Sequence, residues 1–74
     1  MGLRKEILDI ISDNLYESVS EKTELHKFDL FDILEVIYEV EKKYKCKIDD
    51  YDIASTAFNT VKDLIDFCII YIKK

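Results

Sequence analysis

Hydrophobic residues recur every three or four positions near the start of the chain, which places them on one face of a helix. The pattern predicts a helix from about Leu3 to Leu15. Its expected buried face consists of Leu3, Ile7, Leu8, Ile11 and Leu15. The next segment, from Tyr16 to Phe28, keeps no such period, so we expect a long connecting loop there. Long loops are uncommon in compact domains and are often functional when they occur.

A second helical pattern extends from about Leu30 to Tyr44. Asp29 is a good N-cap residue, and Asp32 lies three residues later, in the position of a weak capping box. The expected core stripe consists of Leu30, Ile33, Leu34, Ile37, Val40 and Tyr44. The opposite face should be solvated and holds Asp32, Glu35, Glu39, Lys42 and Lys43.

Two further helices are expected in the last third of the chain. Asp49 or Asp50 can cap a brief helix that contains Tyr51, Ile53 and Ala54, and such a short helix must dock on the others to be stable. Thr60 then caps the last helix, with a carboxylate three residues later. Its expected buried face consists of Val61, Leu64, Ile65, Cys68 and Ile72.

These elements predict an all-α fold with three main helices, one short helix and a long first loop. The composition agrees, because the chain has no Pro and one Gly, and tight turns of a small β-fold would need such residues. The 74 residues are enough for one domain, which we assign to residues 1–74.

The net charge of −5 makes a nucleic acid an unsuitable partner, whereas a basic face on another protein is a suitable one. We find no signal peptide and no apolar run long enough to span a bilayer, so we expect a cytoplasmic protein. Cys46 and Cys68 are expected to be free thiols. No metal site is expected, because the acids at Asp49, Asp50 and Asp52 lack the pattern of an EF-hand.

Three segments, in the right order and register, resemble acyl and peptidyl carrier proteins. Asp29-Leu30-Phe31-Asp32 resembles the Asp-Ser-Leu-Asp/Glu motif at the start of the second helix of that family. The segment Val40–Tyr44, followed by Ile48 and Asp49, is similar to Leu-Glu-Glu-x-Phe followed by Ile and an acid. The segment 59–67 is similar to Thr-Val-x-Asp-Leu-Val-Asp-Tyr. The resemblance covers nearly the whole chain and implies a small acyl-carrier-protein-like four-helix bundle.

The main departure from the family is Leu30, which takes the position of the motif's serine. In the family, that serine hydroxyl is the attachment point for 4′-phosphopantetheine. A leucine has no nucleophilic oxygen, so it cannot form the phosphodiester. The other serines do not lie between Asp and Leu at the start of an acidic helix; they are Ser12, Ser18, Ser20 and Ser55. We expect no phosphopantetheine unless one of these serines serves.

Two interpretations of Leu30 stay open at the sequence level. It is either an ordinary core residue of the apolar stripe, or it lies exposed at the former attachment site. In the second case the site was lost by drift, replaced for a non-carrier role, or mutated on purpose. An exposed Leu30 beside Phe31 would favour the second interpretation.

The resemblance also implies that the second helix docks on a basic surface patch of a carrier-dependent enzyme or transferase, as in fatty acid or polyketide biosynthesis. The implied docking residues are Asp29, Phe31, Asp32, Glu35 and Glu41. We therefore expect a protein-interaction domain that is not an enzyme. One alternative is a working carrier in which Leu30 is an engineered or aberrant replacement. Another is a small lipid-binding or self-associating protein that uses an apolar cavity or the apolar run Phe67–Ile72.

Overall fold

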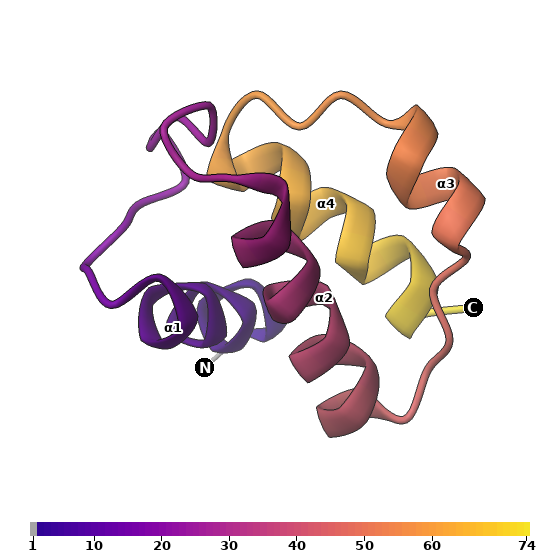
Figure 1. Cartoon of the computed structure of the whole chain (residues 1–74). Helices are drawn as coiled ribbons and strands as arrows, with labels where there is room; N and C mark the ends of the chain where they lie inside the picture. Colours follow the sequence, from indigo (N-terminus) through magenta and orange to yellow (C-terminus); the bar gives the residue numbers. More distant parts are fainter. Residues whose placement is uncertain (1) are drawn as a thin grey trace.

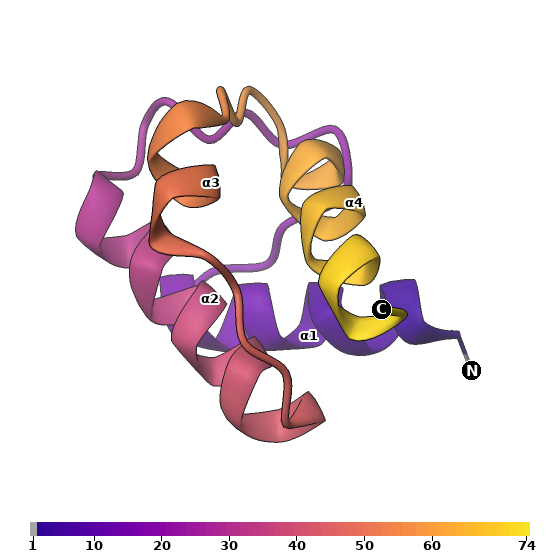
Figure 2. The ribbon, with the colours of Figure 1, turned by 90° about the vertical axis from the view of Figure 1, so that its right-hand side faces the viewer.

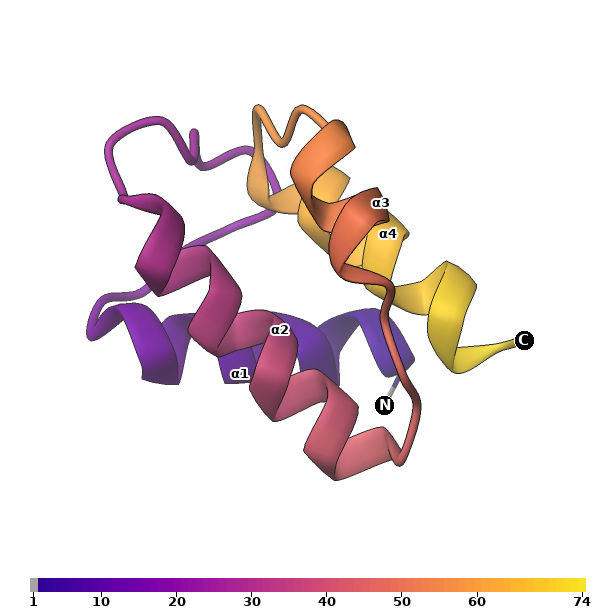
Figure 3. The ribbon, with the colours of Figure 1, turned by 45° about the vertical axis from the view of Figure 1, so that its right-hand side comes forward.

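The computed structural model describes residues 2–74, and these form a bundle of four helices with no β-strand (Figure 1). The helices are α1 (Leu3–Leu15), α2 (Leu30–Tyr44), α3 (Asp50–Ser55) and α4 (Val61–Ile72). α2 crosses α1, and α4 packs against both (Figure 3). The all-α prediction is confirmed, with three main helices, one short helix and a long first loop.

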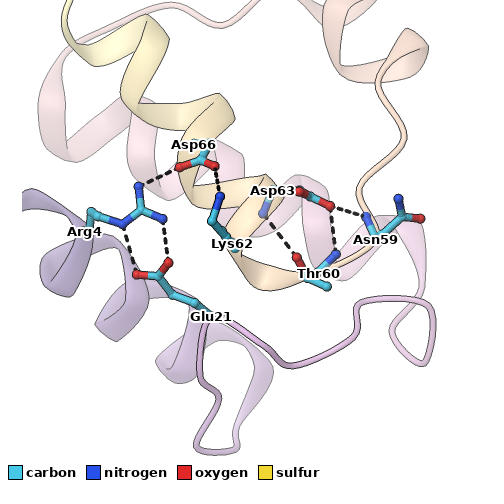
Figure 4. A network of polar contacts seen from close by, with 7 residues as sticks. All are labelled: Arg4, Glu21, Asn59, Thr60, Lys62, Asp63 and Asp66. Carbon is cyan, nitrogen blue, oxygen red and sulfur yellow. Dashed lines mark hydrogen bonds and ion pairs between the residues drawn. The ribbon is translucent and has the colours of Figure 1, made fainter.

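The helix ends follow from local side-chain chemistry. The carboxylate of Asp29 accepts a hydrogen bond from the backbone N–H of Asp32 at 3.0 Å and so caps α2. Asp49 caps α3 by accepting from the N–H of Tyr51 at 2.7 Å. At α4, Thr60 and Asp63 form a reciprocal capping box, as predicted (Figure 4). α2 ends at Tyr44, and its C-cap Lys45 adopts a left-handed conformation with φ 53°.

The core lies where the apolar faces of α1, α2 and α4 meet, and it contains no buried polar side chain among the described residues. On α2 the buried side chains are Ile33, Val36, Ile37 and Val40. Val36 was not in the predicted stripe. Leu30 was, but it lies six residues before Val36, about a third of a turn round the helix, and is exposed. Leu34 and Tyr44 are half-buried.

The first loop is fastened to the connection between α3 and α4. The N–H of Leu25 donates to the carbonyl of Asn59 at 2.9 Å, and the N–H of Val61 donates to the carbonyl of Thr23 at 2.9 Å. Leu25 is buried and joins the core. These contacts close one end of the bundle, so the predicted loop is a paired and packed segment.

A cluster of charged side chains ties the same loop to two helices (Figure 4). The guanidinium of Arg4 donates to both carboxylate oxygens of Glu21, at 3.0 and 2.6 Å, and to Asp66 at 2.6 Å. Lys62 also donates to Asp66, at 3.0 Å. Arg4 therefore joins α1, the first loop and α4 at one point.

α3 is held more lightly than the other helices. It has six residues, of which only Ile53 is buried. Figure 2 shows it between α2 and α4. The hydroxyl of Tyr71 on α4 donates to the carboxylate of Asp52 and supplies a second attachment. A groove remains on the side that faces α2.

Candidate functional site

Leu30 occupies the first position of α2, directly after its N-cap Asp29. Its side chain is 61% exposed, and that of the neighbouring Phe31 is 75% exposed. The interpretation of Leu30 as a core residue is therefore wrong. The reason is geometric: Leu30 lies about a third of a turn round α2 from the buried Val36, on the side of the groove towards α3. The exposed Leu30 beside Phe31 is the arrangement that favours a former attachment site.

Leu30 also forms part of a groove between α2 and α3. The lining side chains are Leu30, Leu34, Tyr38, Asp50, Ile53 and Ala54, and we call this feature the apolar groove. Its volume is about 210 Å³. Asp50 is the one charged group in the lining. The site therefore combines an apolar hollow with a helix start that carries acids.

The acids at the start of α2 have no ionic partner among the described residues. The ion pairs there involve Asp9, Glu17, Glu21, Glu24, Glu39 and Asp66. Asp29, Asp32 and Glu35 are in none of them. Their charges are not compensated by a neighbouring base, so they add to the negative potential at this end of α2.

Glu41 has a local role that the sequence did not indicate. Its Oε2 atom accepts a hydrogen bond from the backbone N–H of Ile48 at 2.7 Å, which fixes the link between α2 and α3. Glu41 lies nine residues after Asp32, or two and a half turns at about 3.6 residues per turn, so the two point to opposite sides of the helix. Glu41 thus points away from Asp32, and its carboxylate is engaged within the protein.

Sequence reasoning missed two exposed aromatic residues near the groove. Tyr38 is 51% exposed and lines the groove, whereas Tyr51 is 77% exposed and follows the lining residue Asp50. The available signal was the spacing of Phe31 and Tyr38, which are seven residues apart and therefore share a face outside the core stripe.

Burial disfavours the reactive thiolate form of both cysteines. Cys68 is fully buried, and this burial raises its pKa to about 12. Burial also raises the pKa of Cys46, and the nearby Glu41 adds to the effect. Both thiols are free, as predicted. Within residues 2–74, we find no cluster of His, Cys, Asp and Glu arranged to hold a metal ion.

The apolar end of α4 is mostly packed against the protein itself. The ring of Phe67 contacts that of Phe58 edge-on at 5.0 Å between centroids, and that of Tyr71 at 5.2 Å. Of the run Phe67–Ile72, Ile70 alone is exposed. None of the described helices combines the length and apolar character needed to cross a membrane.

Comparison with known proteins identifies the family. No protein-family profile and no solved structure matches the chain. The sequence is similar to an acyl carrier protein of Cyanophora paradoxa, with 38% identity over 79 aligned positions that cover 90% of this chain and 75% of that protein. A carrier protein is not itself an enzyme, which agrees with the prediction from the sequence. The chain, a helical bundle with this similarity along nearly its whole length, belongs to the acyl carrier protein family.

Proposed function

We propose that this chain is a divergent acyl-carrier-like domain that docks on a partner enzyme through the acidic start of α2 and carries no phosphopantetheine. The observation that carries the proposal is Leu30, an exposed aliphatic side chain directly after the N-cap of α2. The attachment would need a hydroxyl at this position. The residues present therefore do not fit the prosthetic group of the family.

The other serines give no substitute in this proposal. Ser12 lies within α1, and its hydroxyl accepts a hydrogen bond from the N–H of Val19 at 3.4 Å. Ser18 and Ser20 lie in the first loop, and Ser55 ends α3. None of them follows an acidic N-cap at the start of a helix, which is the context that the family's transferases recognise.

The docking half of the proposal is supported by the uncompensated acids Asp29, Asp32 and Glu35. A group of like charges on one surface raises the association rate with a basic surface, and added salt weakens the effect. Phe31 lies beside these acids and supplies apolar contact area. Glu41 is left out of this docking surface because its carboxylate holds the backbone of Ile48.

We treat residues 1–74 as a single domain. Met1 lies outside the described residues. The buried side chains of the remaining residues form one cluster, to which all four helices and the first loop contribute. This arrangement is the support for one domain.

The position of the lost attachment site can be tested by restoring the hydroxyl. The Leu30→Ser variant should gain one phosphopantetheine group, read by intact mass, when it is co-expressed with a broad-specificity phosphopantetheinyl transferase. Tyr38→Ser places a serine at another exposed position of α2 and should stay unmodified. An unmodified Leu30→Ser protein beside an active transferase would overturn both the positional assignment and the alternative of an aberrant but otherwise working carrier.

The docking surface can be tested in the same system, because the transferase itself then serves as the partner. In the Leu30→Ser background, Glu35→Lys should slow the modification about tenfold or more at low salt. Asp13→Lys makes the same charge change at an exposed position of α1 without an ion pair and is the matched control. Equal rates for the two variants would contradict docking through α2.

A further inference from the structure

We infer that the apolar groove receives one large apolar side chain from a helix of the partner, and that Lys or Arg residues flank this anchor on the partner. The inference rests on the proposed function, since it specifies what the partner presents to α2. It gives Leu30 a positive role as a wall of the binding site.

Exposed apolar and aromatic side chains gather at the apolar groove. Leu30 and Tyr38 line the groove and are 61% and 51% exposed. Phe31 and Tyr51 follow two of the lining residues in the chain and are more exposed still. Single exposed apolar residues are ordinary, but a contiguous group around a hollow is typical of an interaction site.

The size of the groove distinguishes an anchor side chain from a small-molecule ligand. Pockets for drug-sized ligands usually measure about 300–1,000 Å³. The groove holds about 210 Å³ and is open to solvent, so a complete long-chain lipid exceeds it. A single bulky side chain seated in a pocket is the usual form of an interface hot spot.

The negative charges around the groove favour a partner with positive charge beside its anchor. Asp50 lines the groove, and Glu35 lies three residues before the lining residue Tyr38, about 60° round α2 from it. Neither takes part in the ion pairs of the described residues. Lys42, the base nearest along α2, pairs with Glu39 at 3.7 Å. Basic residues beside the anchor would therefore meet uncompensated acids, as in a helix laid into a groove.

The same charges disfavour a second copy of this chain as the occupant. The rim of one copy would face acids of the other, and like charges in contact oppose association. An amphipathic basic helix avoids this repulsion. It is the occupant to which the inference commits.

The probe for the test is a displayed library of helical peptides, about 16 residues long, with randomised surface positions, selected against the full chain. Enriched peptides should share one Leu, Ile, Phe, Met or Trp with Lys or Arg within one turn of it. Ala54→Trp fills the groove and should weaken the best peptide at least about tenfold, whereas Ala57→Trp, on the exposed connection after α3, should not. Leu30→Asp removes the apolar wall without added bulk and should weaken binding as well.

The outcomes separate the inference from the proposed function. If Glu35→Lys weakens the peptide but Ala54→Trp and Leu30→Asp do not, docking through α2 stands and the groove inference is wrong. If none of these variants matters, or no peptide is enriched, the groove inference fails, and docking through α2 is then decided by the transferase rates of the Glu35→Lys and Asp13→Lys variants. Binding of decanoate that Ala54→Trp abolishes would assign the groove to a lipid. If the apparent molecular mass of the protein in solution rises with concentration, and Ala54→Trp removes this rise, the groove binds a second copy of the chain. Either of the last two results overturns the inference.

Discussion

At the scale of single residues, Leu30 lacks the hydroxyl that the attachment needs and adds apolar surface at the same position. The isobutyl group offers no oxygen for a phosphodiester, and it adds apolar surface at the start of α2, where solvent reaches it. An exposed leucine gains little from burial, so the stability of the fold does not explain its presence. Its neighbours in the groove do offer an explanation, because an apolar wall helps to bind an apolar anchor.

This argument predicts that Leu30→Ser leaves stability nearly unchanged. Exposed substitutions away from special features usually alter the free energy of unfolding by less than about 0.5 kcal/mol. Urea denaturation of the parent and the variant measures the difference. A loss of more than about 2 kcal/mol would show that Leu30 packs as a core residue does.

The thiols give a second prediction at this scale. Burial raises the pKa of Cys68 to about 12, so the reactive thiolate is scarce at neutral pH, and solvent does not reach the sulfur. In the native protein at pH 8, a thiol reagent should label Cys68 far more slowly than in denaturant. Labelling of native and unfolded protein at equal rates would contradict the burial of this side chain. Cys68→Ser, which leaves Cys46 alone, assigns the slow phase.

At the scale of secondary-structure elements, α2 divides its acids between two tasks. Glu41 accepts from the backbone of Ile48 and fixes the link to α3, whereas Glu35 faces solvent and has no ion pair. Glu41→Ala should therefore lower the free energy of unfolding by about 1.5–3 kcal/mol, since a hydrogen bond to a charged group is lost. Glu35→Ala should leave it almost unchanged.

Binding should show the opposite pattern. Glu35→Ala should weaken docking on the transferase in the Leu30→Ser background, and Glu41→Ala should not, provided both variants are folded by circular dichroism. If Glu41→Ala weakened docking as strongly as Glu35→Ala without a change in stability, the separation of the two acids would be wrong.

The elements with strong local signals were predictable from the sequence. The bounds of α1 and α2 follow from apolar residues at helical spacing, and the start of α4 from the Thr60–Asp63 capping box. The predicted core stripe of α2 included the exposed Leu30 and left out the buried Val36, because the helical period does not show which side of α2 the other helices cover. The pairing of the first loop with the α3–α4 connection, and the bond of Glu41, depend on contacts that leave no periodic trace.

At the scale of the whole molecule, the Arg4 cluster joins segments that are far apart in the sequence. Its guanidinium holds the pKa values of Glu21 and Asp66 below their usual range. In the unfolded chain these carboxyls return to pKa values of about 4. Below that pH, the carboxyls of Glu21 and Asp66 bind protons in the unfolded state while they are still ionised in the folded state. The stabilisation is therefore present above about pH 4 and is lost as the pH falls through the folded pKa values.

Arg4→Met tests this linkage, because it removes the charge and keeps an apolar side chain. The variant should have a lower urea midpoint than the parent near pH 7, and the two midpoints should converge as the pH falls below about 4. Lys5→Met, whose exposed ion pair with Asp9 lies within α1, is the control with a small effect. A difference between Arg4→Met and the parent that stays constant with pH would show that Arg4 acts through packing alone.

The most direct test of the central claim is the intact mass of the unaltered chain after co-expression with an active, broad-specificity phosphopantetheinyl transferase. We expect no change in mass, because the residue exposed at the start of α2 is Leu30. A gain of one phosphopantetheine group would mean that one of the serines at positions 12, 18, 20 or 55 is the attachment site. That result would contradict the account of this chain as a carrier fold without carrier chemistry.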